Sequence, residues 1–212
     1  MGYSYAWNDD QTDAELVEAA GMDRVYRIAD SKAPGGFREQ KWHYPSRQEC
    51  MFCHSRAAGF VLGLNTRQMN HGHQLETFDR IGLFERPLEK DAKDYESLPN
   101  PFDPKAAPLE TRVRAYLDVN CAMCHVNDGG GNANIVVSYQ TPLDQTKLIG
   151  ETPLHDIGGT NMRVIAPGAP DRSVLYRRMT TRAESQMPPS STAIVDEQGA
   201  ALVAEWIRGL RN

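Results

Sequence analysis

Two short runs of the 212-residue chain combine cysteine and histidine at a spacing that can bind a cofactor. Each is a Cys-x-x-Cys-His pentapeptide, and together the two runs use all four cysteines of the protein. Two thiols one helical turn apart can form thioethers with the vinyl groups of a haem edge, and the adjacent histidine is then placed to bind the iron. The spacing predicts two covalently bound c-type haems, with these attachment and iron-binding residues: Cys50, Cys53 and His54, then Cys121, Cys124 and His125.

Disulfides, a zinc site or a thioredoxin-like redox pair are the alternative uses of four cysteines. Disulfides do not require a histidine directly after each pair. A zinc ribbon places its second Cys-x-x-Cys pair roughly 15–20 residues after the first, and Cys53 and Cys121 are much further apart. No βαβ pattern of the thioredoxin type surrounds either pair. Haem attachment is therefore the favoured interpretation.

The composition excludes some partners. The net charge is −5 and the isoelectric point is about 5.7, which argues against nucleic acid and favours a basic redox partner. No run of 18 or more apolar residues is present, so no membrane span is expected. The polar start of the sequence is not a signal peptide. Because c-type haem is attached outside the cytoplasm, we expect an exported, periplasmic protein of which this chain is the mature or an excised portion.

Hydrophobic periodicity predicts a mainly α fold with two haem lobes. Short irregular strands are expected around 3–7 and 25–28, and helices at 74–84, 109–121, from Asp171 to 178 and from Asp196 to 210. Prolines concentrate in 87–108, which predicts an extended linker. The expected division is an N-terminal haem lobe with short β segments (1–86), the linker (87–108) and a helical haem domain (109–212).

The second half of the chain resembles class I cytochrome c. From about residue 109 the order is helix, haem motif, glycine-rich loop, helix, Met-Pro-Pro and an aromatic-bearing terminal helix. The resemblance implies a class I cytochrome c-like helical domain with His125 as the proximal iron ligand and Met187 as the distal one. Methionine sulfur favours ferrous iron, so this pair tends to raise the reduction potential.

The distal ligand of the first haem is less defined. Met69 is the first candidate, and His71 and His73 in the same short segment are the alternatives. His43, upstream of the motif, is a further option. A second imidazole would give a low-potential haem, a methionine a higher potential, and no ligand an open, reactive iron.

A second resemblance rests on short sequence segments spread over nearly the whole chain. These segments are Tyr5–Ala14, Tyr44–Arg47, Val61–Gly63, Gln68–Asn70, Arg114–Leu117, Gly129–Asn132, Ile165–Gly168 and Met187–Pro189. These runs resemble a family of secreted dihaem c-type cytochromes, which occur alone or as the C-terminal part of larger, often dehydrogenase-like proteins. The resemblance implies electron transfer and further sequence upstream.

The expected function is one-electron transfer outside the cytoplasm, as an electron carrier and not an enzyme. The expected partner is a redox protein or a fused dehydrogenase-type module. The alternative is a dihaem peroxidase-like enzyme in which the haem of His54 stays open and activates peroxide. That chemistry needs an acid–base group over the iron, and Glu49, directly before the first motif, is expected to face solvent.

Overall fold

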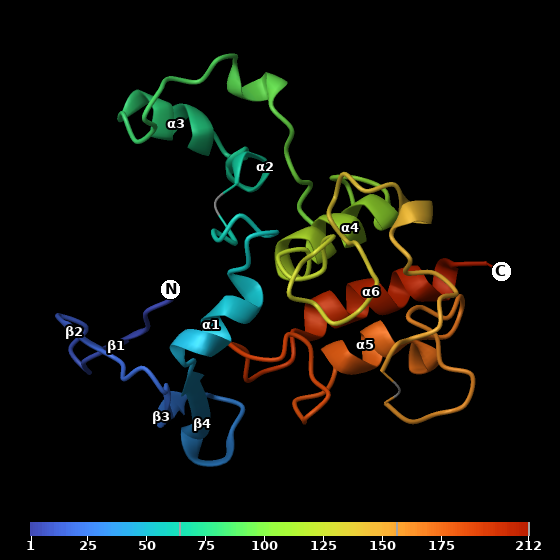
Figure 1. Ribbon diagram of the computed structural model, residues 1–212, viewed down its shortest axis with the longest axis horizontal. Helices are drawn as coiled ribbons and strands as arrows, with labels where there is room; N and C mark the ends of the chain where they lie inside the picture. Colours follow the sequence, from blue (N-terminus) through green and yellow to red (C-terminus); the bar gives the residue numbers. More distant parts are fainter. Residues whose placement is uncertain (64, 156, 212) are drawn as a thin grey trace.

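The computed structural model describes residues 1–63, 65–155 and 157–211 (Figure 1). Two antiparallel hairpins come first, three helices follow around and after the first Cys-x-x-Cys-His motif, and three more belong to the second half. The strands are β1 (Tyr5–Trp7), β2 (Ala14–Leu16), β3 (Met22–Ala29) and β4 (Phe37–Tyr44). The α-helices are α1 (Arg47–Cys53), α2 (Thr66–Met69), α3 (Gln74–Arg80), α4 (Leu109–Asn120), α5 (Val174–Met179) and α6 (Glu197–Gly209).

The expected mainly α class is wrong. Helices account for 29% of the chain and strands for 12%. Most of the region between α4 and α5 is irregular backbone, satisfied by loop hydrogen bonds such as Val136 N–H to the Thr146 carbonyl (3.0 Å) and by an isolated bridge between Ile149 and Ile165. Buried backbone must have its polar groups paired, but loop hydrogen bonds can do this as well as a helix can. The segments around the Cys-x-x-Cys-His motifs and the prolines therefore do not have to be helical.

The N-terminal strands form two separate two-stranded sheets. β1 pairs with β2, and β3 pairs with β4 in a register that places Met22 opposite Tyr44 and Ala29 opposite Phe37. Along β3 and β4 one face is half-buried and the other exposed, as the two-residue period of a strand requires. The strand expected at 3–7 is confirmed as Tyr5–Trp7, and the one at 25–28 lies within β3.

Helix α1 begins with a reciprocal cap that connects it to β4. The Ser46 hydroxyl accepts from the Glu49 N–H (3.2 Å), and the Glu49 carboxylate accepts from the Ser46 N–H (2.8 Å). Such a capping box satisfies two otherwise unpaired donors. Nε2 of His43, on β4, lies 3.2 Å from the same carboxylate, and its Nδ1 lies 2.7 Å from Asp23. These bonds fix the start of the helix that carries Cys50 and Cys53.

The principal hydrophobic core lies where α4 and α6 pack side by side, with α5 against α6 (Figure 1). Its buried residues come from both long helices and from the loops between them: Val113, Tyr116, Leu117, Ala122, Val137, Leu148, Ile165, Leu202, Val203, Trp206 and Ile207. The helices expected at 109–121 and from Asp196 are confirmed, and the Asp196 side chain caps α6 by accepting from the Gly199 N–H (2.9 Å).

A helix beginning with Asp171 as its cap was a wrong expectation. Pro170–Arg172 forms a 3-10 turn, and α5 begins at Val174. Ser173, fully buried between the two, accepts from the Ala166 N–H (2.9 Å) and donates to the Ala169 carbonyl (2.9 Å). The short side chain that organises this corner is therefore a serine that bonds to the preceding loop.

Gly199 marks the closest approach of α4 and α6. A Cβ atom at this position would overlap the ring of Tyr116. The Tyr116 hydroxyl passes over the glycine and donates to the Asp196 carboxylate (2.9 Å). Burial and this carboxylate both raise the pKa of Tyr116, so the phenol stays protonated and keeps donating at all ordinary pH values.

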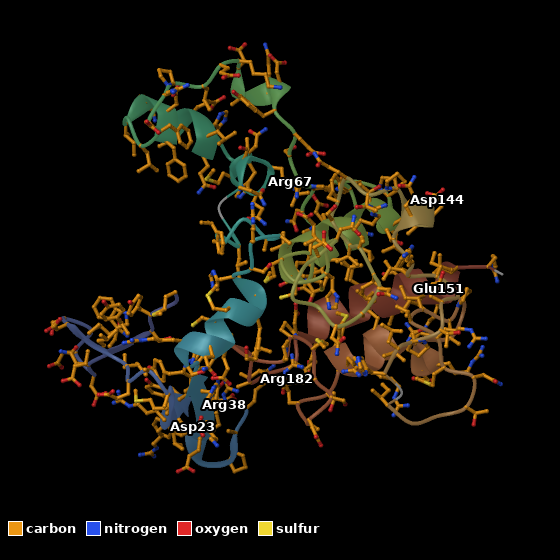
Figure 2. All side chains as sticks on the ribbon, in the orientation of Figure 1. Asp23, Arg38, Arg67, Asp144, Glu151 and Arg182 are labelled. Atoms are coloured by element: carbon orange, nitrogen blue, oxygen red, sulfur yellow. The ribbon has the colours of Figure 1, made fainter. Side chains whose placement is uncertain are left out.

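A buried ion pair connects the segment after the first motif to α4. Arg67 on α2 (Figure 2) donates from Nε and Nη2 to both carboxylate oxygens of Asp118, at 3.2 and 3.1 Å. The Asp118 side chain is 1% exposed and that of Arg67 is 22% exposed. The Tyr139 N–H also donates to Asp118 (2.7 Å). Such a bidentate pair fixes both distance and orientation.

The expected linker at 87–108 holds one 3-10 turn, Ala92–Asp94, and is otherwise without helix or strand. Asn70 fastens its first half by donating to the carbonyls of Ala92 (2.9 Å) and Tyr95 (2.8 Å). The division at 1–86 and 109–212 stays a prediction, and residue 212 lies outside the described residues. No helix in the described part of the chain is long and apolar enough to cross a membrane.

Candidate functional site

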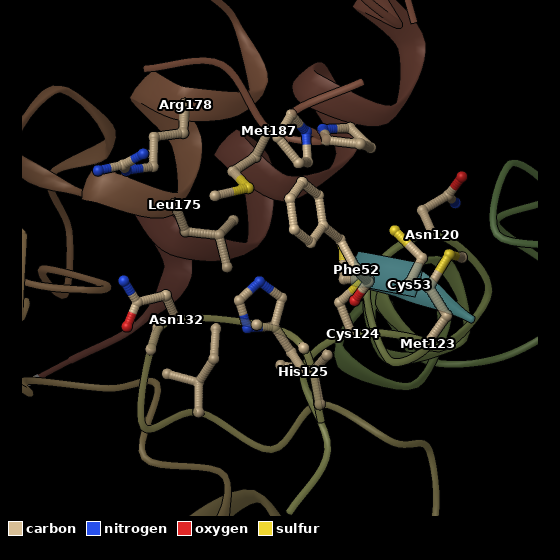
Figure 3. Close-up of a pocket in the computed structure, with 18 of the residues that line it drawn as sticks. Phe52, Cys53, Asn120, Met123, Cys124, His125, Asn132, Leu175, Arg178 and Met187 are labelled. Atoms are coloured by element: carbon tan, nitrogen blue, oxygen red, sulfur yellow. The ribbon is translucent and has the colours of Figure 1, made fainter. Parts of the chain in front are cut away.

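Both Cys-x-x-Cys-His motifs line one large cavity (Figure 3). Its volume is about 1080 Å³, at the upper end of the ~300–1,000 Å³ typical of small-molecule and cofactor pockets. Segments from α1, the end of α4, the loops around residues 130–135 and 151–155, α5 and the 187–192 turn form the wall. Two motifs far apart in the sequence are thus brought to one site.

Each cysteine pair spans a single turn at the end of a helix. Cys50 and Cys53 lie three residues apart in the last turn of α1, and therefore on one face. Cys121 directly follows α4, and the N–H groups of Cys124 and His125 both bond to its carbonyl, at 3.1 and 3.0 Å. All four thiols are free. This is the arrangement that two thioether bonds to one ring edge need.

The second pair of thiols is held protonated. Burial raises the pKa of Cys121 to about 12, and burial followed by the neighbouring Cys53 raises the pKa of Cys124 to about 12. Reactive redox cysteines act as thiolates and sit where that form is stabilised. The environment of Cys121 and Cys124 therefore does not suit a thioredoxin-like pair.

His54 is oriented by its own loop. Its Nδ1 lies 2.7 Å from the Phe60 carbonyl oxygen, so Nδ1 carries the proton and donates, and Nε2 is left with its lone pair available. A bond of this kind fixes the tautomer and ring orientation of a metal-binding histidine. His54 also lines the cavity, which makes it a ready axial ligand.

His125 and Met187 face the cavity from opposite sides (Figure 3). Nδ1 of His125 is buried without a hydrogen-bond partner among the described residues, and burial lowers the pKa of this imidazole. A neutral imidazole is the form that binds iron. Met187 is held in place through its backbone, whose N–H donates to the Arg178 carbonyl (2.9 Å). The structure therefore brings both predicted ligands of the second haem to one cavity.

Met69, His71 and His73 are not brought to this cavity. Met69 ends α2 and is half-buried, whereas His71 and His73 are exposed. His73 has a left-handed backbone conformation, and its Nδ1 lies 2.6 Å from Glu76. Both ring nitrogens of His43 are engaged by carboxylates. The distal ligand of the first haem stays a prediction.

Sequence reasoning missed several residues of the cavity wall. Phe52, from the first motif, projects its ring toward the space between His125 and Met187 (Figure 3). Arg178 and Arg182 also line the cavity. Nε of Arg182 is buried with no bonding partner in the described part of the chain, while its Nη1 and Nη2 donate to backbone carbonyls. Haem carries two propionates, and arginine is the side chain suited to carboxylates. Neither arginine has a sequence signal of its own, because Arg178 lies within α5 and Arg182 follows shortly after that helix.

The residues present fit a c-type haem. The cavity supplies paired thiols, an oriented or buried imidazole beside each pair and two arginines for propionates. In the described ranges, no three Cys, His, Asp or Glu side chains are grouped so that they could hold a metal ion directly. Porphyrin-bound iron does not require such a group, because the macrocycle supplies four of its ligands.

Comparison of the chain with protein-family models, with curated proteins and with solved structures found no match.

Proposed function

We propose that the protein is a dihaem c-type cytochrome that transfers single electrons between redox partners outside the cytoplasm. The observation that carries this proposal is the convergence of both Cys-x-x-Cys-His motifs on one cavity, with Met187 opposite His125. The redox partner that we propose is a separate redox protein or a fused dehydrogenase-type module.

Each residue has a definite role in this proposal. Cys50 and Cys53 would hold one haem, and Cys121 and Cys124 the other, through thioethers. His54, oriented by the Phe60 carbonyl, presents Nε2 and would bind the iron of the first haem. His125 and Met187 would hold the iron of the second. When bound, a c-type haem supplies an iron that alternates between ferric and ferrous states. The surrounding residues would then need only to hold the ring and set the potential.

A peroxidase-like reaction at the first haem is less well supported. Such a reaction needs a free acid–base group beside the iron, and Glu49 lines the cavity with its side chain 35% exposed. However, its carboxylate is already engaged by the Ser46 N–H and by His43, and these bonds lower the pKa of Glu49, Ser46 having the larger effect. It is a helix cap, not a proton donor.

Covalent haem content tests the proposal. After production in a host that attaches c-type haem, denatured protein should carry two haems per chain, measured by intact mass and by the pyridine haemochrome spectrum. The double variant Cys121→Ala/Cys124→Ala should carry one. A chain without covalent haem, or one that holds stoichiometric zinc, would contradict the proposal. Carbon monoxide binding to the reduced protein would contradict pure electron transfer and support an open first haem.

Replacement of Met187 by alanine is expected to remove the distal ligand of the second haem. The absorption band of methionine-ligated ferric haem should disappear, and the reduction potential of that haem should fall because the thioether favours ferrous iron. Met179→Ala is the matched control, since Met179 lines the same cavity from the end of α5. Persistence of the band in Met187→Ala, or its loss in Met179→Ala, would reassign the ligand.

A further inference from the structure

The two haem-attachment motifs contact each other directly. Phe52, between the cysteines of the first motif, has its carbonyl oxygen 4.0 Å from Sγ of Cys124 in the second. The Cys53 thiol is also close enough to Cys124 to contribute to the raised pKa of that thiol. Figure 3 shows Phe52 and Cys53 beside Cys124. The attachment points of the two motifs therefore share one edge of the cavity.

A run of three glycines makes this contact possible. A Cβ at Gly130 would overlap the Phe52 carbonyl, and one at Gly131 would lie 2.6 Å from Nδ1 of His125. The loop itself is tied to the second motif, because the Gly131 N–H donates to the Cys124 carbonyl (2.9 Å). Gly130 thus lets a loop anchored on one motif rest against the backbone of the other.

The ion pair between Arg67 and Asp118 holds the same two segments together from another side. Arg67 follows the first motif on α2, and Asp118 precedes the second on α4. The Arg67–Asp118 ion pair and the Phe52–Gly130 contact thus restrain the distance between the two motifs at two separate points. The relative position of the motifs is therefore built into the fold and does not depend on one flexible loop.

We infer that the Phe52–Gly130 contact is a positioning contact that keeps the two haem-attachment sites side by side, so that the two haems act as one coupled pair. This inference rests on the proposed function. Charges close together in a protein interior interact strongly, and groups that interact in this way titrate as a pair and not as independent sites. An electron taken up at one site would then make uptake at the other less favourable.

Circular dichroism in the Soret region tests the inference, because two nearby haems couple their transitions and give a band with lobes of opposite sign. We expect this two-lobed band in the wild-type protein and its absence from Cys121→Ala/Cys124→Ala. Gly130→Ala, which forces the Phe52 backbone away, should lose amplitude in this band, and its two potentials should lie closer together. Gly63→Ala is the control and should match the wild type, since the one described side chain that a Cβ there would meet is that of Gln68, at 3.9 Å.

Covalent haem content separates failure of this inference from failure of the proposed function. A chain without two covalent haems contradicts the proposed function itself. Two haems without a two-lobed band would overturn the coupled pair. An unchanged band in folded Gly130→Ala would overturn the positioning role of the Phe52–Gly130 contact. Either result leaves electron transfer intact. If Gly130→Ala does not fold, the comparison between the wild type and the single-haem variant decides.

Discussion

Arg67→Ala is expected to lower the free energy of unfolding by about 3–5 kcal/mol, the cost of removing one partner from a buried ion pair. The loss leaves Asp118, whose side chain is 1% exposed, with the Tyr139 N–H and without its bidentate cation. Chemical denaturation of the wild-type and variant proteins, prepared in the same way, measures the difference. In the double variant with Asp118→Ala, the loss should be smaller than the sum of the single losses.

Arg24→Ala provides the matched control for Arg67→Ala. Arg24 also pairs with an aspartate, Asp9, at 2.9 Å, but the two side chains are 38% and 91% exposed. Exposed pairs contribute about 0–1 kcal/mol, so this variant should remain close to the wild type. If the two substitutions lowered the free energy of unfolding equally, the pair between Arg67 and Asp118 would not be the stabilising connection between the two halves that its burial indicates.

Gly199→Ala should destabilise the protein although alanine is the better helix former. The new Cβ would meet the Tyr116 ring and push apart α4 and α6, and overpacking of this kind costs about 1–3 kcal/mol. It would also displace the Tyr116 hydroxyl from the Asp196 carboxylate that caps α6. Thermal and chemical unfolding of the variant measure the loss.

Gly209, in the last turn of the same helix, is the internal control. Among the described residues, no atom beyond its chain neighbours and its own helix backbone lies within 4 Å of a Cβ built there. Gly209→Ala should therefore be neutral or slightly stabilising, as expected from helix propensity alone. Opposite signs at two glycines of one helix would locate the close helix contact at Gly199. A stabilising Gly199→Ala would show that the crossing has room for a methyl group.

The parts of the fold that could be predicted from sequence are those set by local patterns. Helices α4 and α6 were predicted because Val113 and Leu117, and likewise Val203 and Ile207, recur at helical spacing. Strand β4 was missed, because its residues 38–41 are all polar, and no apolar side chain among them marks the half-buried face to which Arg38 and Gln40 belong. The mainly α class failed because irregular loops, and not helices, form much of the cavity wall.

The candidate site divides in the same way. The cysteines and histidines of the two motifs identify themselves by type and spacing, and Met187 stands out by its place before two prolines. Phe52 and Arg182 do not, because their role arises from the approach of segments distant in the sequence. Met69, His71 and His73 were chosen because they are close to His54 in the sequence. The structure does not bring them to the cavity that His54 lines, so the distal ligand of the first haem stays a prediction.

Three successive glycines, 129–131, each lie against a different neighbour: the Cys124 carbonyl, the Phe52 carbonyl and the His125 ring. A side chain at any of the three positions would displace a different part of the site, so no single compensating change elsewhere could restore all three. For protein engineering, this run is the part of the cavity wall least open to redesign. Substitutions in the cavity wall are better sought at Phe52, a residue that is 59% exposed and lines the cavity.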